Sequence, residues 1–167
     1  MLHVLVLADT HLRRDWPNRV LPGQVRAMLE EADVVLHAGD VLQPEHLDDL
    51  ARYAPLHVVR GNNDRELDGV PERLEVELDG VRVGMVHDSG PARGRAGRLH
   101  AMFPDADVVV FGHSHVPWDE VGVDGQRLFN PGSPTERRQQ PHRTAGWLDV
   151  EDGRVVDLRT VVVDDGA

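Results

Sequence analysis

The sequence has no cysteine and no lysine, so all eighteen of its Lys and Arg residues are arginine. The absence of cysteine excludes disulfide bonds and thiolate metal sites. Any metal ion must therefore be held by oxygen and nitrogen ligands. The exclusive use of arginine is a compositional bias, to which we attach no function.

Net positive charge and long apolar runs are also absent. The formal net charge is −11, which argues against an extensive nucleic-acid-binding surface. This charge is compatible with a small phosphate-ester substrate, because bound divalent cations would make the local charge of the site positive. No apolar run approaches the roughly 20 residues of a membrane-spanning helix. The apolar start, residues 1–8, lacks a basic leader, so we expect a strand there and a cytoplasmic protein without membrane association.

A length of 167 residues is typical of one domain, and 40% hydrophobic residues can supply a core. We therefore interpret residues 1–167 as a single domain. Apolar runs alternate with helical patterns in the first part of the chain. The expected strands are 2–8, 33–37 and 56–59, and the expected helices between them are 22–30 and 44–52. This β-α-β-α-β order is typical of a parallel sheet with helices on its faces.

The second half of the chain is mostly antiparallel in pattern. Asp-Gly pairs between alternating segments predict three hairpins. Their turns are Asp79-Gly80, Asp124-Gly125 and Asp152-Gly153. The expected strands are 74–78 and 81–83 in the first hairpin, 118–123 and 126–129 in the second, and 147–150 and 155–163 in the third. A weak helix is expected over 91–102 and a buried strand over 107–111. We predict a mixed α/β protein in which two sheets pack together with helices outside.

Five apolar runs end in residues that commonly bind metals. These residues are Asp9 and His11; Asp40; Asn62; His87; and His113 and His115. A His-x-His pair alone is weak evidence for a metal site, and the convergence of five runs is what gives it weight. In open α/β sheets, sites form beyond the carboxyl ends of the strands.

Seven such ligands suit two divalent ions that share one carboxylate. We expect Asp40 to be shared, because it follows the middle strand of the first unit, and Gly39 and Gly61 would let backbone approach closely. Two ions about 3.5–4 Å apart can hold a bridging hydroxide for in-line attack on phosphorus. Imidazole and carboxylate ligands favour Mn, Fe, Zn, Co or Ni over calcium.

The spacing of these blocks resembles that of the calcineurin-like metallophosphoesterase superfamily. The matching blocks are Asp9-Thr10-His11, Gly39-Asp40, Gly61-Asn62-Asn63-Asp64, His87 and Gly112-His113-Ser114-His115. The length, the compact spacing and Asn130-Pro131-Gly132-Ser133 resemble its small YfcE-like phosphodiesterase branch.

The resemblance implies a four-layer α-β-β-α sandwich of two mixed β-sheets flanked by helices, with a dinuclear metal site. Asp9, His11 and His115 would hold the first ion. Asn62, His87 and His113 would hold the second, and Asp40 would bridge them. The implied activity is a metal-dependent phosphodiesterase, with manganese favoured as activator. A homo-oligomer is compatible, because small relatives often form dimers or larger assemblies.

The chain departs from the family pattern at three positions. Many members have histidine where this chain has Asn63, and that histidine is thought to protonate the leaving group or hold the phosphate. Asn63 cannot release a proton at neutral pH. We therefore expect activated aryl diesters to be cleaved better than diesters with poor leaving groups. Asp64 is expected to orient a neighbouring group at the catalytic site. Asp88-Ser89 stands where relatives often have Gly-His.

Other interpretations stay open at this point. The chain could be a non-catalytic metal-binding scaffold, like the retromer subunit of the superfamily, or a phosphomonoesterase on the same metals. Asn130-Pro131-Gly132-Ser133 is either a structural turn or a wall of the site. Arg137 and Arg138 are either solvated or within reach of a substrate phosphate. We expect His37 to be a core histidine or a partner of a ligand.

Overall fold

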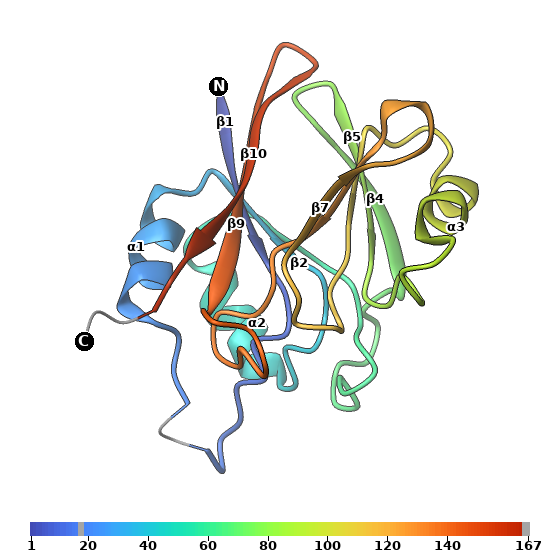
Figure 1. Ribbon diagram of the computed structural model, residues 1–167. Coiled ribbons are helices and arrows are strands. Elements are labelled where there is room, and N and C mark those ends of the chain that lie inside the picture. The colour runs from blue at the N-terminus through green and yellow to red at the C-terminus, as the bar shows by residue number, and fades with distance from the viewer. Residues whose placement is uncertain (17–18, 165–167) are drawn as a thin grey trace.

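The computed structural model describes residues 1–16 and 19–164, which form two five-stranded sheets packed face to face (Figure 1). Residues 17–18 and 165–167 of the expected single domain lie outside the described residues. The two sheets are each mixed, and helices cover their outer faces. The predicted four-layer α-β-β-α sandwich is therefore confirmed.

The first sheet has the strand order β10-β9-β1-β2-β3. Its strands are β1 (Leu2–Leu7), β2 (Val34–His37), β3 (Leu56–Val58), β9 (Thr144–Glu151) and β10 (Arg154–Val162). β1, β2 and β3 are parallel, with Val6 opposite Leu36. β9 and β10 add an antiparallel edge.

The second sheet has the order β4-β5-β6-β8-β7. Its strands are β4 (Arg73–Leu78), β5 (Val81–Val86), β6 (Val108–Val110), β7 (Trp118–Val121) and β8 (Arg127–Asn130). β5, β6 and β8 are parallel, and β4 and β7 are antiparallel edges. Each sheet thus has three parallel strands whose carboxyl ends share one edge.

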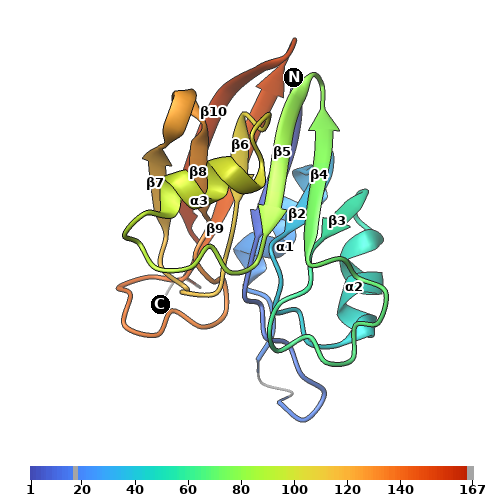
Figure 2. The ribbon, with the colours of Figure 1, turned by 90° about the vertical axis from the view of Figure 1, so that its right-hand side faces the viewer.

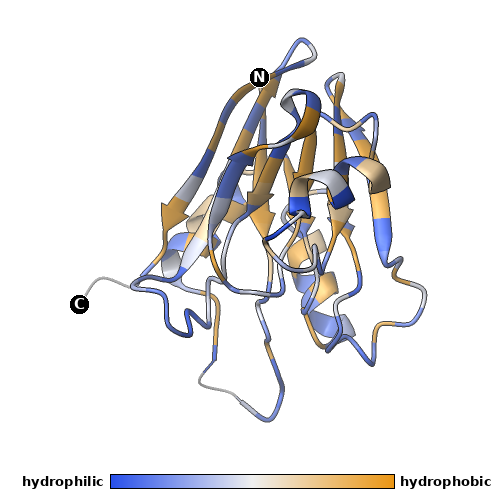
Figure 3. Ribbon diagram, turned by 45° about the vertical axis from the view of Figure 1, so that its right-hand side comes forward, coloured by the Kyte–Doolittle hydropathy of each residue, from blue (hydrophilic) through white to orange (hydrophobic). Residues whose placement is uncertain are grey.

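Alternation along the strands divides the apolar residues among three layers. In β1, Val4 and Val6 pack in the core between the sheets, whereas Leu5 and Leu7 face α1 (Gly23–Glu31) and α2 (Pro44–Ala51). α3 (Arg95–Met102) covers the outer face of the second sheet (Figure 2). The strands are accordingly rich in hydrophobic residues, and many loops beyond them are hydrophilic (Figure 3).

All three predicted hairpins are present. Their turn residues have positive φ angles, as a type I′ turn requires, for example 46° at Asp79 and 81° at Gly80. Gly153 donates a backbone hydrogen bond of 2.8 Å to the Asp79 oxygen. This bond ties the first hairpin to the last at the end of the sandwich away from the strand carboxyl ends (Figure 1).

Several predicted boundaries are wrong by a few residues. The helix expected from residue 91 begins at Arg95, because Gly94 is left-handed with φ of 75° and interrupts a right-handed helix. The strand expected up to Val123 ends at Val121, where a short 3-10 turn follows. β9 begins earlier than expected because both its neighbours pair with Gly146. No helix in the described part of the chain combines the length and apolar character that crossing a bilayer requires.

Candidate metal centre

The expected ligands gather beyond the carboxyl ends of the parallel strands. β1, β2 and β3 lead to the loops that carry Asp9 and His11, Asp40, and Asn62. β5 and β6 lead from the other sheet to His87, His113 and His115. These loops meet at the lower edge of the sandwich in Figure 1. The face-to-face packing of the sheets therefore places both sets of side chains in one site.

The backbone of this site is strained. Five of the seven expected ligands have positive φ angles: Asp9 (53°), His11 (44°), Asp40 (60°), His113 (70°) and His115 (60°). Left-handed conformations are unfavourable for residues with a Cβ, and they concentrate at functional sites. The conformation also lets His113 and His115, two residues apart, direct their rings into different halves of the centre.

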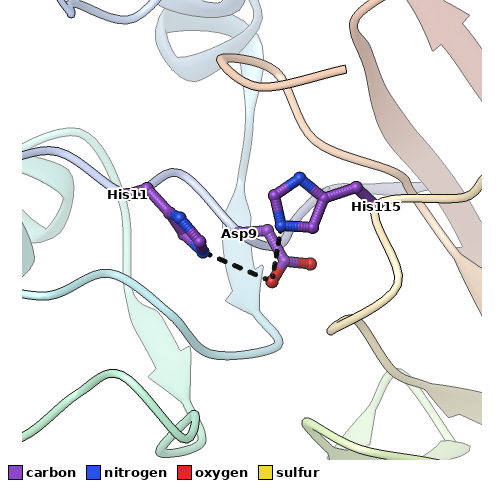
Figure 4. A group of neighbouring side chains, drawn as sticks. All are labelled: Asp9, His11 and His115. Atoms are coloured by element: carbon purple, nitrogen blue, oxygen red, sulfur yellow. Dashed lines mark ion pairs between the residues drawn. The ribbon is translucent and has the colours of Figure 1, made fainter. Parts of the chain in front are cut away.

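Asp9, His11 and His115 form the first half of the centre (Figure 4). Oδ1 of Asp9 lies 3.5 Å from Nε2 of His115 and 3.7 Å from Nε2 of His11. The other carboxylate oxygen of Asp9 accepts a 2.9 Å hydrogen bond from the backbone N–H of His113. That bond fixes the carboxylate so that Oδ1 points between the two rings.

Two buried atoms in this half lack a hydrogen-bond partner among the described residues. They are Oδ1 of Asp9 and Nε2 of His115. Nδ1 of His115 donates to the Glu136 backbone oxygen at 2.6 Å, so Nε2 carries a lone pair. Two buried acceptors therefore face each other, which is costly unless a cation lies between them. The residues present fit a bound divalent metal ion.

Asp9, Asp40 and His87 form the second cluster of donors. Nδ1 of His87 donates to the Ala38 backbone oxygen at 2.7 Å, which directs Nε2 into the site. That Nε2 lies 3.5 Å from Oδ2 of Asp40 and 4.0 Å from Oδ1 of Asp9. Asp9 is thus common to both clusters.

Asn62 and His113 lie on the same side as His87. Oδ1 of Asn62 is 3.0 Å from Nε2 of His87 and 3.0 Å from Nδ1 of His113. The rings of His87 and His113 meet edge to face at 5.2 Å, and those of His11 and His115 at 5.0 Å. The structure therefore brings all seven expected ligands together, in two histidine pairs with the carboxylates between them.

The carboxylates and histidines change each other's pKa. Burial lowers the pKa of His11, but Asp40 and Asp9 outweigh burial and raise it to about 9. The pKa of His87 is also raised, by the same carboxylates against burial. Burial opposes ionisation of Asp40, but His11 and His87 keep its pKa below the usual range. Burial lowers the pKa of His115, so that its ring stays neutral and able to bind a metal ion.

Asn63 holds the carboxylate of Asp40. Its backbone N–H donates to Oδ1 at 2.9 Å, and its side-chain amide donates to Oδ2 at 2.7 Å. Gly61 makes this loop compact, since a Cβ there would lie only 2.1 Å from Oδ1 of Asp40. The close approach predicted for Gly61 is present, and Asn63 contacts a metal-ligand candidate directly.

Asp64 is buried and uses both oxygens on backbone groups. One oxygen accepts hydrogen bonds from the N–H groups of Asp40 and Gly61, at 2.8 and 2.7 Å. The other accepts from the N–H of Leu42 at 2.7 Å. Leu42 itself has a φ of 88°. Asp64 therefore holds the two loops that present Asp40 and Asn62.

Glu136 contacts two of the expected ligands, although the sequence did not predict a role for it. Its Oε2 lies 3.0 Å from Nδ1 of His11, and its backbone oxygen accepts from His115. Ser133 supports the same region by donating to the Asp9 backbone oxygen at 2.8 Å. Glu136 stands in a polar loop without periodicity, and no local signal marks it. Ser133 belongs to the turn at 130–133, whose resemblance to the family pattern could have indicated its place beside the site.

The turn at 130–133 and His37 both contact the loops that carry the expected ligands. The Asn130 amide donates to the backbone oxygen of Gly112 at 3.0 Å, so this turn braces the loop that carries His113. His37 is fully buried and lies 3.1 Å from the Thr10 hydroxyl. Burial lowers the pKa of His37 to about 3, which keeps it neutral. His37 is a core histidine, as predicted.

Two clefts border the centre. One, of about 560 Å³, is lined by Asn62 and His87, and the other, of about 500 Å³, is lined by His11 and Asn63. Arg138 lines the second cleft. Arg137 instead donates to the Gln140 backbone oxygen at 2.6 Å, within its own loop. The two neighbouring arginines therefore have different surroundings.

The sequence of the chain is similar to those of a phosphoesterase family. The sequence model of the calcineurin-like phosphoesterase superfamily domain matches residues 2–153. A protein named "Probable metallophosphoesterase" from Methanothermobacter thermautotrophicus is 34% identical over 139 residues, covering 80% of this chain and 77% of the relative.

Two solved structures share the fold. Vps29 of Entamoeba histolytica complexed with zinc superposes with a TM-score of 0.74 at 23% identity, covering 98% of this chain and 100% of that one. A protein described as a novel archaeal phosphodiesterase has a TM-score of 0.67 at 22% identity, covering 96% and 99%. At these identities the likeness establishes the fold.

Proposed function

Because the chain belongs to the calcineurin-like phosphoesterase superfamily, we propose that it is a metal-dependent phosphodiesterase acting on small phosphate esters. The observation that carries this proposal is the pair of buried, unpartnered acceptors, Oδ1 of Asp9 and Nε2 of His115. They lie 3.5 Å apart and need a cation. His11 lies beside the same two atoms, and Asp40 and His87 join Asp9 in the neighbouring cluster.

The first ion would be held by Asp9, His11 and His115. The second would be held by Asn62, His87 and His113, with Asp40 shared between them. When bound, the two ions would supply Lewis-acid activation of a water molecule and charge stabilisation on phosphorus. Manganese is the ion that we propose first, with iron, zinc, cobalt and nickel as alternatives.

The choice of the shared carboxylate rests on distances to both histidine pairs. Oδ2 of Asp40 lies 3.1 Å from Nε2 of His11 and 3.5 Å from Nε2 of His87. Asp9 also reaches both halves, and it belongs to both clusters. Counting bound ions in Asp40→Asn and Asp9→Asn separates the two, since the variant of the shared ligand should lose affinity for both ions.

The remaining residues of the site have supporting roles in this proposal. Asn63 restrains Asp40 through two hydrogen bonds, and Asp64 positions the loops through backbone N–H groups. Neither supplies a proton to a leaving group. The site is thus suited to diesters whose leaving group departs as a stable anion, such as aryl phosphodiesters.

The test is hydrolysis of bis-p-nitrophenyl phosphate by chelator-stripped protein, titrated with Mn²⁺. Activity should appear as about two ions bind per chain. Asp40→Ala should abolish turnover while circular dichroism shows an intact fold. Turnover by that variant would overturn the role of Asp40.

Other outcomes would favour other functions. Faster release of p-nitrophenol from p-nitrophenyl phosphate than from the diester would indicate a phosphomonoesterase. Metal binding without hydrolysis of any diester, together with capture of a partner protein, would favour a non-catalytic scaffold. Failure to bind metal would overturn the assignment of the ligands.

A further inference from the structure

We propose that Arg65 and Arg138 form a subsite for a second, non-scissile phosphate of the substrate. The proposal rests on the phosphodiesterase function above and narrows its substrate class. The substrate would be a phosphodiester that carries a further phosphate group on the side of His11. Nothing in the ligand pattern of the metal centre requires such a group.

The two arginines line the cleft of about 500 Å³ that borders His11 and Asn63. A cleft of this size accommodates a ligand as large as a nucleotide. Arg65 and Arg138 are both exposed residues, so their guanidinium groups are accessible to a ligand in the cleft. A substrate with its scissile phosphorus at the metal centre would extend along them.

Ion pairing in this cleft leaves only these two arginines uncompensated. Arg13 lines the cleft and is paired with Asp15. The cleft is also lined by two carboxylates, and each is paired with an arginine that does not line it. Glu66 lies 3.7 Å from Arg14, and Glu136 lies 3.4 Å from Arg19. Among the described residues, no carboxylate lies within ion-pair distance of Arg65 or Arg138. The chain has a net charge of −11, so these two unpaired guanidinium groups supply positive charge beside the metal centre of an otherwise acidic protein.

Hydrogen bonds connect both arginines to loops of the metal centre. The N–H of Arg65 donates to the Asn63 oxygen at 2.9 Å, in the turn that holds Asp40. Arg138 has a φ of 51°, and its guanidinium lies 3.5 Å from the His113 backbone oxygen. Their positions relative to the ligands are therefore set by the same loops that build the site.

Guanidinium groups suit a phosphate because their planar fork donates paired hydrogen bonds to two oxygens. A phosphodiester alone has one negative charge, which the metal ions would take up. A further phosphate monoester would bring about two more negative charges to the cleft. Exposed ion pairs are weak because water and salt screen them, so we expect about a threefold lower KM per arginine.

The experiment compares two substrates with the same scissile group. Thymidine 5′-(p-nitrophenyl phosphate) has no second phosphate, and its 3′-phosphorylated form has one. With the Mn²⁺-loaded protein, KM for the 3′-phosphorylated form should be about tenfold lower, with similar kcat, and the advantage should shrink as ionic strength rises. Arg65→Gln and Arg138→Gln should each reduce the ratio of the two KM values about threefold.

Arg137→Gln is the matched control. It removes the same charge from the neighbouring position, but Arg137 is folded onto Gln140 and does not line the cleft. The KM ratio should stay at its original value in this variant. An equal effect of all three substitutions would indicate general electrostatic attraction and would overturn the subsite.

A binding measurement separates this inference from the proposed function. Thymidine 3′,5′-bisphosphate should bind about tenfold more tightly than thymidine 5′-phosphate by calorimetry, without any turnover. Hydrolysis of bis-p-nitrophenyl phosphate with equal KM for the two thymidine substrates would overturn the subsite alone. If the protein hydrolyses no diester but still binds the bisphosphate more tightly, the proposed phosphodiesterase function would be overturned and the subsite would stand.

Discussion

The carboxylate of Glu136 lies 3.0 Å from Nδ1 of His11, on the side of the ring away from the metal centre. A carboxylate at this position orients a metal-binding imidazole and raises its basicity. Glu136→Gln should therefore weaken Mn²⁺ binding by about tenfold, measured by calorimetry.

Glu66→Gln is the control for this change. Glu66 lines the same cleft and is 3.7 Å from Arg14, but it contacts none of the expected ligands within the described residues. Its Mn²⁺ affinity should equal that of the unchanged protein. Equal weakening in both variants would mean that Glu136 acts only through the charge of the cleft.

Asn63 restrains Asp40 and cannot protonate a leaving group. Asn63→His should raise kcat/KM for thymidylyl-thymidine, whose alkoxide leaving group needs a proton, about tenfold relative to bis-p-nitrophenyl phosphate. Chromatography of the products and p-nitrophenol absorbance give the two rates. Asn63→Ala serves as the control, because it removes the hydrogen bond to Oδ2 of Asp40 without adding an acid. An increase of the ratio in Asn63→Ala as well would contradict the explanation.

The raised pKa of His11 predicts how metal binding depends on pH. With a pKa of about 9 in the metal-free protein, His11 is protonated at neutral pH, and a metal ion must displace that proton. The apparent Mn²⁺ affinity should therefore rise with pH and level off near pH 9. Calorimetry in two buffers of different ionisation enthalpy should detect proton release at neutral pH. Release that is unchanged in His11→Gln would show that another group supplies the proton.

The same shift has a consequence for stability. A folded-state pKa above the ordinary value of 6.5 means that the protonated His11 stabilises the metal-free fold. This contribution is complete below the unfolded-state pKa and is lost as pH rises through about 9. The melting temperature of the metal-free protein should therefore fall over this range, and bound Mn²⁺ should offset the loss.

The sequence predicted the architecture because its signals are local. Short apolar runs identified β1, β2 and β3, and Asp-Gly turns identified all three hairpins. The expected ligands were also found, because each follows an apolar run. These features depend on neighbours within a few positions along the chain.

The parts that sequence could not predict depend on distant contacts. Glu136 reaches His11 across the sequence only after the loops close, and nothing near it in the chain signals this. The same holds for Arg65 and Arg138, whose shared cleft exists only in the folded protein. The late start of the helix expected from residue 91, which begins only at Arg95, depends on the left-handed Gly94. A glycine permits that conformation but does not require it.

Gly61 is the position where one methyl group should disable the centre. A Cβ there would lie 2.1 Å from Oδ1 and 2.4 Å from the backbone nitrogen of Asp40. Asp40 is held on both sides by Asn63 and Asp64, so it cannot move away without breaking their hydrogen bonds. Gly61→Ala should therefore lower the free energy of unfolding by about 2 kcal/mol. It should also weaken Mn²⁺ binding, because Asp40 leaves its position between His11 and His87.

Gly97→Ala is the matched comparison, since a Cβ there would contact nothing within 4 Å and the residue lies in α3. Replacing a helical glycine with alanine stabilises by up to about 1 kcal/mol. Denaturation by urea should thus shift in opposite directions for the two variants, and Mn²⁺ binding should change only in Gly61→Ala. Normal metal affinity in Gly61→Ala would mean that the loop can relax around the methyl group, and the restraint of Asp40 by its neighbours would then be weaker than its hydrogen bonds indicate.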